Sequence, residues 1–364
     1  MSNLDFKGFP TTRYQGSKRK LLPWIYKNIK SLNFKTALDV FGGTASVSYL
    51  LKRMGRKVIY NDYLRFNYLQ GKALIENNNV ILNDSDLKFL TSRHKSISYN
   101  FFVQKTFHDI YYTDEENAWI DKFLCNLKNI SNIYDEDIAQ YKKALAFSAF
   151  AQSALKKRPF NLFHRSNLYL RLNKVKRSFG NKTSWDGSFE KYLKYVVKEL
   201  NKSVFDNKKK NTALNMNASD LNNKEKIDFV YLDPPYVRKG VSTSDVDYMR
   251  FYHFLDGASD PESWEYRINY DSSNLRMEDN HVNEWISPQK NRAAFENLFE
   301  TFRKSVIVVS YKEPGIPKKR ELIYSLKKYK VQLYEAYLIL QALRGEFKGL
   351  SWTHMRTLLP ILAN

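Results

Sequence analysis

The N-terminal part of the chain alternates between apolar runs and short polar turns. Apolar positions with helical spacing predict a helix from about Lys20 to Leu32. The apolar stretches Thr36–Val40 and Lys57–Tyr60 predict two buried strands, and Val47–Met54 between them has the periodicity of a helix. A strand, a glycine-containing turn, a helix and a second strand form the opening of a nucleotide-binding α/β unit.

The pattern becomes helical in the middle of the chain, where no strong signal for a parallel strand is visible. The clearest segment is Asp137–Leu155, whose helical spacing predicts one apolar face. That face comprises Ile138, Tyr141, Leu145, Phe147 and Phe150. A very polar run, Asn201–Asn223, closes this part of the chain.

Strand patterns return after the polar run. Ile227–Leu232 is continuously apolar and ends at Asp233, and Ser305–Val309 is a second buried strand. Lys330–Tyr337 and His354–Leu359 have the composition of a closing pair of strands.

The whole pattern predicts the α/β fold class, with a Rossmann-like sheet and one insertion. Residues 1–82 and 213–364 would form the sheet domain, and residues 83–212 a mainly helical inserted domain. The segment Val237–Pro288 is rich in Asp, Tyr, Ser and Asn. A structureless loop of that length is unusual in a compact domain, so residues 237–288 should contain short helices and a partly mobile flap near the site.

Charge points to the kind of partner. The chain carries 59 Lys and Arg against 38 Asp and Glu, a formal net charge of +21. Such an excess favours a polyanion such as nucleic acid, although a solvated basic surface would give the same count. Cys125 is the single cysteine, which excludes an internal disulfide and a multi-cysteine metal site; no metal is expected. Met1–Pro10 lacks a secretory signal and no apolar run is long enough for a bilayer, so we expect a cytoplasmic protein without membrane contact.

The tetrapeptide Asp233-Pro234-Pro235-Tyr236 is the strongest chemical signal, because it directly follows a buried strand. Active sites of open α/β sheets lie at the carboxyl ends of strands. The prolines restrict the backbone, so the Asp233 carboxylate and the Pro234 carbonyl could accept both protons of a purine's exocyclic amine. Tyr236 offers a face on which a flipped base could stack. A plain strand-ending turn is the alternative.

A glycine turn after the first strand, Phe41-Gly42-Gly43-Thr44, would let the backbone approach a ligand at the head of the next helix. It is not the full dinucleotide fingerprint, because Ala45 stands where another glycine would be expected.

Acidic residues near the strand ends are suited to the rest of such a ligand. Asp39 could pair with an ammonium group such as that of S-adenosylmethionine, and Asp62 could accept from both ribose hydroxyls. Asp220 could accept from the adenine amine of the cofactor, and Lys18 could reach its carboxylate. An N-cap role for Asp62, a capping role for Asp220 and a solvated Lys18 are the alternatives.

Basic and aromatic residues alternate between Lys156 and Asn181, as they do on surfaces that contact phosphates and base edges. An exposed basic loop would have the same composition. The predicted DNA-binding residues are Lys156, Arg158, Arg165, Asn167, Arg171, Arg177 and Asn181.

These motifs, in this order, resemble the Dam-like (alpha-ordered) group of DNA N6-adenine methyltransferases over most of the chain. Arg13–Lys18 resembles the opening motif of that group, which implies that Tyr14 and Lys18 touch the cofactor. The insertion has the place of the target-recognition domain of that group. Ala45 in place of glycine and Tyr14 in place of the more usual tryptophan are departures that concern cofactor affinity.

The resemblance implies an S-adenosylmethionine-dependent enzyme that methylates adenine N6 in a specific sequence of double-stranded DNA after base flipping. It also implies a prokaryotic or phage-encoded protein that is paired with a restriction endonuclease or acts alone. Methylation of cytosine N4 or of RNA adenine, and a non-catalytic DNA-binding role, are the alternatives. Enzymes acting on cytosine N4 usually begin the tetrapeptide with serine, so Asp233 favours adenine.

Overall fold

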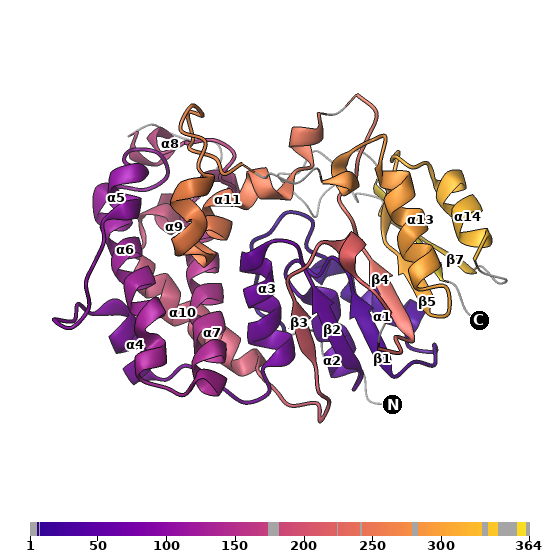
Figure 1. Ribbon diagram of the computed structural model, residues 1–364, viewed down its shortest axis with the longest axis horizontal. Coiled ribbons are helices and arrows are strands. Elements are labelled where there is room, and N and C mark those ends of the chain that lie inside the picture. Colours follow the sequence, from indigo (N-terminus) through magenta and orange to yellow (C-terminus); the bar gives the residue numbers. More distant parts are fainter. Residues whose placement is uncertain are drawn as a thin grey trace.

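A computed structural model describes residues 6, 8–173, 182–223, 225–240, 242–278, 283–329, 334–340 and 355–361. A β-sheet and its flanking helices form one half of the molecule, and a group of helices forms the other half (Figure 1). No helix within these ranges combines the length and apolar composition that a bilayer span requires.

The sheet has a parallel centre and an antiparallel edge. Its strands are β1 (Thr36–Asp39), β2 (Lys57–Asn61), β3 (Thr212–Leu214), β4 (Phe229–Leu232), β5 (Val306–Val309), β6 (Tyr311–Glu313), β7 (Tyr334–Leu340) and β8 (Met355–Ile361). Strands β3, β2, β1, β4 and β5 lie side by side and are parallel. β8 runs antiparallel to β5 and β6 and also pairs with β7. This mixed α/β architecture with a central parallel sheet confirms the predicted fold class.

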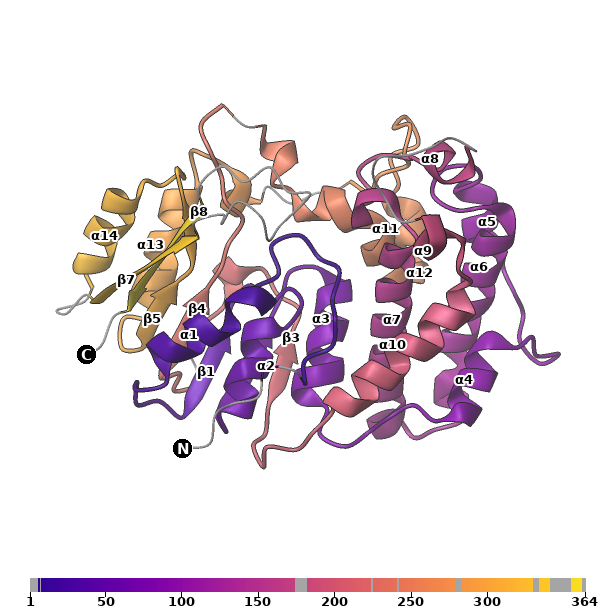
Figure 2. The same ribbon diagram turned by 180° about the vertical axis from the view of Figure 1, so that it is seen from behind.

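Helices cover both faces of the sheet, because successive side chains of each strand point to opposite sides. Ala37 packs in the cluster that contains α1 (Leu22–Ile29), α2 (Ser46–Arg53) and α3 (Arg65–Gly71). Leu38, the next residue, packs in the cluster with α13 (Asn291–Thr301) and α14 (Lys319–Lys327). Figure 1 shows α13 and α14 in front of the sheet, and Figure 2 shows α1 and α2 in front of the opposite face.

The helical half lies beside the β3 edge of the sheet (Figures 1 and 2). It contains α4 (Asp84–Thr91), α5 (Phe102–Thr106), α6 (Asp114–Lys128), α7 (Glu136–Lys156), α8 (Tyr169–Leu172), α9 (Lys182–Asp186) and α10 (Phe189–Ser203). α7 packs against both α3 and α10. Its buried residues belong to the same hydrophobic cluster as the α1–α3 face of the sheet, so one core joins the two halves. The domain boundaries at residues 83 and 212 therefore stay a prediction.

The α7 helix differs from its predicted amphipathic form. Every residue from 144 to 155 is buried, whereas Ile138 is 40 % exposed. This half of α7 is buried on all sides because the helix has neighbours on several sides, including α3, α6 and α10. The prediction that Ile138 is part of its buried face is therefore wrong.

The segment 237–288 contains α11 (Tyr248–Ser259), α12 (Pro261–Trp264) and single 3-10 turns. Residues 251–259 of α11 are all buried, and α11 packs against α3. α11 is thus part of the core, and the flap predicted for residues 237–288 stays a prediction.

Candidate active site

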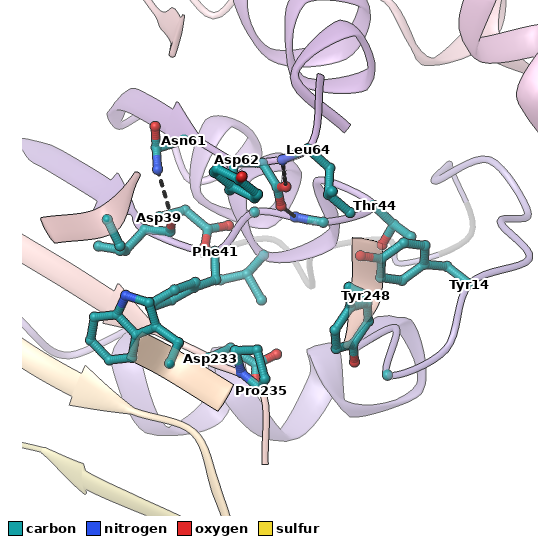
Figure 3. A pocket seen from close by; sticks show the side chains of 18 of the residues that line it. Tyr14, Asp39, Phe41, Thr44, Asn61, Asp62, Leu64, Asp233, Pro235 and Tyr248 are labelled. Carbon is teal, nitrogen blue, oxygen red and sulfur yellow. Dashed lines mark hydrogen bonds between the residues drawn. The ribbon is translucent and has the colours of Figure 1, made fainter. Parts of the chain in front are cut away.

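A cavity lies at the carboxyl ends of β1 and β4, where the order of the strands reverses. β1 pairs with β2 on one side and with β4 on the other, which is the point at which ligands bind in open α/β sheets. The cavity has a volume of about 1040 Å³, including the part that is open to solvent. Figure 3 shows side chains from the first strand–helix unit on one side and Asp233 on the other.

The predicted glycine turn forms part of the cavity wall. Phe41, Gly42, Gly43 and Thr44 all line the cavity. A Cβ at Gly42 would overlap the ring of Tyr60, whose hydroxyl donates a 2.8 Å hydrogen bond to the carbonyl of Gly43. Only glycine therefore fits at position 42 while Tyr60 supports the turn from beneath.

Ala45 follows the glycine turn and is the N-cap of α2. Its φ is 60°, in the left-handed region, where a Cβ costs roughly 1–2 kcal/mol. The departure from glycine noted in the sequence thus lies at a position whose backbone favours glycine.

Asp39 at the end of β1 is 1 % exposed and lines the cavity. Its Oδ2 accepts hydrogen bonds from the Ser48 amide at 3.1 Å and the Ser48 hydroxyl at 2.7 Å. Its Oδ1 is buried and has no partner among the described residues. Burial raises the pKa of Asp39 to about 7, although the bonds from Ser48 act in the opposite direction.

Asp62, which follows β2, fixes the two loops around it (Figure 3). Its Oδ2 accepts from the Gly43 amide at 2.8 Å, and its Oδ1 accepts from the Leu64 amide at 2.9 Å. Burial raises its pKa to about 6, and the bonds from Gly43 and Leu64 limit the rise. Asn67 Nδ2 also donates to Oδ1 at 3.2 Å. Because each carboxylate oxygen has two acceptor positions, Oδ2 retains one toward the cavity that Asp62 lines.

Asp233 lies at the end of β4 on the opposite wall, and Pro235 lines the cavity beside it. The Lys18 ammonium forms an ion pair with Asp233 Oδ2, and the Tyr236 hydroxyl donates to Asp233 Oδ1. Burial alone would lower the pKa of Lys18, but the Asp233 carboxylate outweighs it and raises that pKa. Lys18 was predicted to touch the cofactor carboxylate; in this structure its partner is Asp233.

Two members of the tetrapeptide do not line the cavity. Pro234 is buried, and Tyr236 lies edge-on to Tyr311 with its hydroxyl directed at Asp233. In this structure Tyr236 therefore orients the carboxylate, and its ring is not part of the cavity wall.

Tyr14 lines the cavity as part of an aromatic stack. Its ring is 4.7 Å from the ring of Tyr252 and 5.5 Å from that of Tyr248, both of which belong to α11. Tyr248, Met249 and Trp285 also line the cavity, and the sequence analysis did not identify them. The i, i+4 spacing of Tyr248 and Tyr252, which places both rings on one helix face, was the available signal.

Asp220 does not lie where it was predicted. It is exposed at the end of a 3-10 turn (Ala218–Asp220) and does not line the cavity. Met216, Asn217 and Ala218 line this part of the wall. The turn exposes Asp220, which corrects the predicted contact with the cofactor's adenine.

Two arginines predicted to bind DNA are buried. Arg158 is 1 % exposed and donates to the carbonyls of Tyr111 and Arg165 at 3.2 and 2.7 Å. Arg171 is 6 % exposed and pairs with Glu116 at 2.6 Å. Both side chains hold the helical half together, and this structural role replaces their predicted contact with phosphate.

The remaining predicted DNA-binding residues are more accessible or lie outside the described part of the chain. Arg165 is exposed, and Lys156 is half-buried with its ammonium 4.3 Å from the centre of the Tyr192 ring. Asn167 is buried and adopts a left-handed φ of 57°. Arg177 and Asn181 lie outside the described residues.

Comparison with known proteins identifies the chemistry of this architecture. Residues 14–306 match the D12 class N6 adenine-specific DNA methyltransferases. The chain is 29 % identical to the type II methyltransferase M2.HphI of Haemophilus parahaemolyticus, over 88 % of each chain. It is 26 % identical to the modification methylase StsI of Streptococcus sanguinis and 27 % identical to the type II methyltransferase M.FokI of Planomicrobium okeanokoites.

The coverage differs among these relatives. The alignment with StsI covers 88 % of this chain and 46 % of the relative, and that with M.FokI covers 93 % and 50 %. The chain thus spans about half the length of these two proteins, but nearly all of M2.HphI. Because the family match extends from Tyr14 past the tetrapeptide that begins at Asp233, the chain belongs to the D12 class N6 adenine-specific DNA methyltransferase family.

Proposed function

We propose that this adenine-specific DNA methyltransferase binds S-adenosylmethionine between Asp39 and Asp62 and a flipped adenine beside Asp233. Membership of a methyltransferase family implies a donor of the S-adenosylmethionine type. The observation that carries the proposal is that the three carboxylates, from three strand ends, line one cavity.

The residues of the cavity fit the proposed donor. Asp39 Oδ1 is a buried acceptor without a partner, which suits the ammonium of an amino acid. Asp62 Oδ2 retains an acceptor position for a ribose hydroxyl, and the half-buried Gly43 lines the cavity beside it. When bound, the donor supplies a methyl group on a positively charged sulfur, which is intrinsically reactive.

Asp233 is the residue proposed to hold the adenine amine. Its carboxylate would accept one proton of the amine in a hydrogen bond, and the Pro234 carbonyl would accept the other, which concentrates the lone pair on nitrogen. In the described structure Lys18 and Tyr236 already bind Asp233, so they hold its carboxylate oriented before the base arrives. Positioning of the two reactants would supply most of the acceleration.

Substitution of Asp233 tests the proposed mechanism. Asp233→Ala should abolish methyl transfer while donor binding, measured by calorimetry, is largely retained. Substantial formation of N6-methyladenine by this variant, measured by mass spectrometry of nucleosides, would contradict the assignment. Parallel DNA and RNA substrates would reveal any N4-methylcytosine or methylated RNA.

We also propose that the enzyme acts in a restriction–modification system, because the names of its relatives describe type II methyltransferases and a modification methylase. Sequencing of methylated bases in DNA from cells that express the protein would give its recognition site. That DNA should resist an endonuclease that cleaves the same site, and cleavage at fully methylated sites would contradict the pairing.

A further inference from the structure

A second hollow lies on the α11 side of the molecule, between loop 164–167, the first turn of α11 and the turn 269–276. Its volume is about 1190 Å³, including the part that is open to solvent. In both ribbon views the orange loop after α12 lies beside α8 (Figures 1 and 2). Segments that are distant in sequence therefore build one surface feature.

Buried hydrogen bonds fix the two loops to each other. Asn274 Nδ2 donates to the carbonyl of Phe163 at 3.1 Å. The Tyr111 hydroxyl lies 2.6 Å from the carbonyl oxygen of Asn274 and 2.9 Å from that of Phe163. Tyr111 is fully buried and Asn274 is 8 % exposed, so the walls of the hollow are held from the core.

The hollow is strongly basic. Arg165, Arg250 and Arg276 line it, and Asp271 is the carboxylate among its lining residues. None of these arginines forms an ion pair with another residue that the structure describes. The pKa of His164, which also lines the hollow, is lowered by burial and then by Arg165 and Arg250, with Asp245 acting weakly in the opposite direction.

The position of α11 connects this hollow to the catalytic cavity. Tyr248 and Met249 line the cavity, and Arg250, the next residue, lines the hollow. A ligand that extends from the cavity across the first turn of α11 would therefore meet these arginines. Duplex DNA is such a ligand, because phosphates continue on both sides of a base held in the cavity.

We propose that the arginine hollow, formed by Arg165, Arg250 and Arg276, binds backbone phosphates of duplex DNA next to the target adenine. Unpaired guanidinium groups match phosphate oxygens in charge and geometry, and the hydroxyl of Ser273 adds a neutral donor. The proposal rests on the proposed function in placing the target base in the cavity, and it assigns a role to the segment after the catalytic tetrapeptide.

Salt dependence of DNA binding tests the proposal. Each phosphate contact contributes about 0.9 to the slope of log affinity against log salt concentration. Arg250→Gln and Arg276→Gln should each reduce that slope by about 1, and the double variant by about 2. Arg320→Gln is the matched control, because Arg320 is an exposed arginine of α14 at the opposite edge of the molecule (Figure 1).

Two comparisons make the test decisive. Arg276→Lys should retain most of the slope, since a lysine still neutralises a phosphate; a loss equal to that of Arg276→Gln would overturn the phosphate assignment. Unchanged slopes for both glutamine variants, or an equal loss in Arg320→Gln, would also overturn it. Unaltered donor binding by each variant would show that the fold is retained.

The binding experiment needs no methyl transfer, so it separates this proposal from the proposed mechanism. In the Asp233→Ala background the arginine variants should show the same differences in slope. Methylation by Asp233→Ala would refute the catalytic role of Asp233 and leave the assignment of the hollow intact. Normal catalysis together with unchanged slopes would refute the hollow alone.

Discussion

Asp39 shows how one buried carboxyl can make donor binding depend on pH. Its pKa is raised to about 7 by burial, so the folded protein holds it protonated at lower pH. In the unfolded chain its pKa returns to the ordinary value of 3.8. Asp39 therefore lowers folding stability as pH rises from about 4 to about 7, while the ionised form that a bound ammonium requires is populated only above that range.

Donor affinity should consequently fall as pH decreases through about 7. Below the midpoint the loss should approach tenfold for each pH unit, because binding of the ammonium then requires release of one proton. Calorimetric titrations between about pH 5.5 and pH 8.5, in steps of about half a pH unit, would measure the donor affinity at each pH. Asp39→Asn should bind weakly at every pH and lose the dependence attributed to Asp39.

Ser48→Ala provides the matched variant, since Ser48 donates two bonds to the ionised Asp39. Loss of the hydroxyl should move the midpoint to higher pH, because the remaining amide bond stabilises the carboxylate less. A midpoint that is identical in the wild type and Ser48→Ala would show that another group, such as Asp62, controls the dependence.

Gly42 should tolerate no side chain. Gly42→Ala would force its Cβ into the Tyr60 ring, and overpacking of this kind costs about 1–3 kcal/mol. Denaturant unfolding would measure the loss, and donor affinity should decrease with it. Combination with Tyr60→Leu should recover part of the stability, whereas strictly additive effects of the two substitutions would contradict the proposed contact.

At the scale of elements, the sequence predicted strands that are buried on both faces. Continuous apolar runs identified β1, β2, β4 and β5 to within about two residues. β3 was not predicted, because its three residues lie within the polar run 201–223 and pair with β2 for reasons that local sequence does not contain.

The site residues likewise divide into those that local sequence identified and those whose position depends on tertiary packing. Asp39, the glycine turn and Asp233 follow strands and line one cavity, since strand ends of a parallel sheet converge at one edge. The contribution of Tyr248 depends on how α11 packs against Tyr14, and the exposure of Asp220 depends on the direction of one short turn. Composition likewise could not distinguish buried arginines from those available to DNA.

Arg171 offers a test of that distinction. It shares Glu116 with Lys157, and both cations are buried. Arg171→Ala removes one of the two cations that pair with Glu116 among the described residues, and loss of one partner of a buried ion pair typically costs about 3–5 kcal/mol. The unfolding free energy should fall accordingly. If the variant instead kept its unfolding free energy but showed a smaller slope of log DNA affinity against log salt concentration, Arg171 would contact DNA as the sequence predicted.

At the scale of the molecule, the two halves share a hydrophobic core. The cluster that contains β1 and α2 also contains α6, α7 and α10, so neither half can lose its structure without exposing apolar surface of the other. Equilibrium unfolding should therefore be a single transition, with coincident curves from far-UV circular dichroism and tryptophan fluorescence. Two separated transitions would instead favour an autonomous inserted domain at residues 83–212.

The first turn of α11 lines both the cavity proposed for the donor and the arginine hollow. Any displacement of that turn by a nucleic acid strand changes the space left for the methyl donor, and the reverse also applies. Thermodynamic reciprocity requires the two effects on affinity to be equal. If bound duplex raises the affinity for the donor about threefold, bound donor raises the affinity for the duplex by the same factor. The enzyme would thus assemble its ternary complex cooperatively through a single shared helix turn.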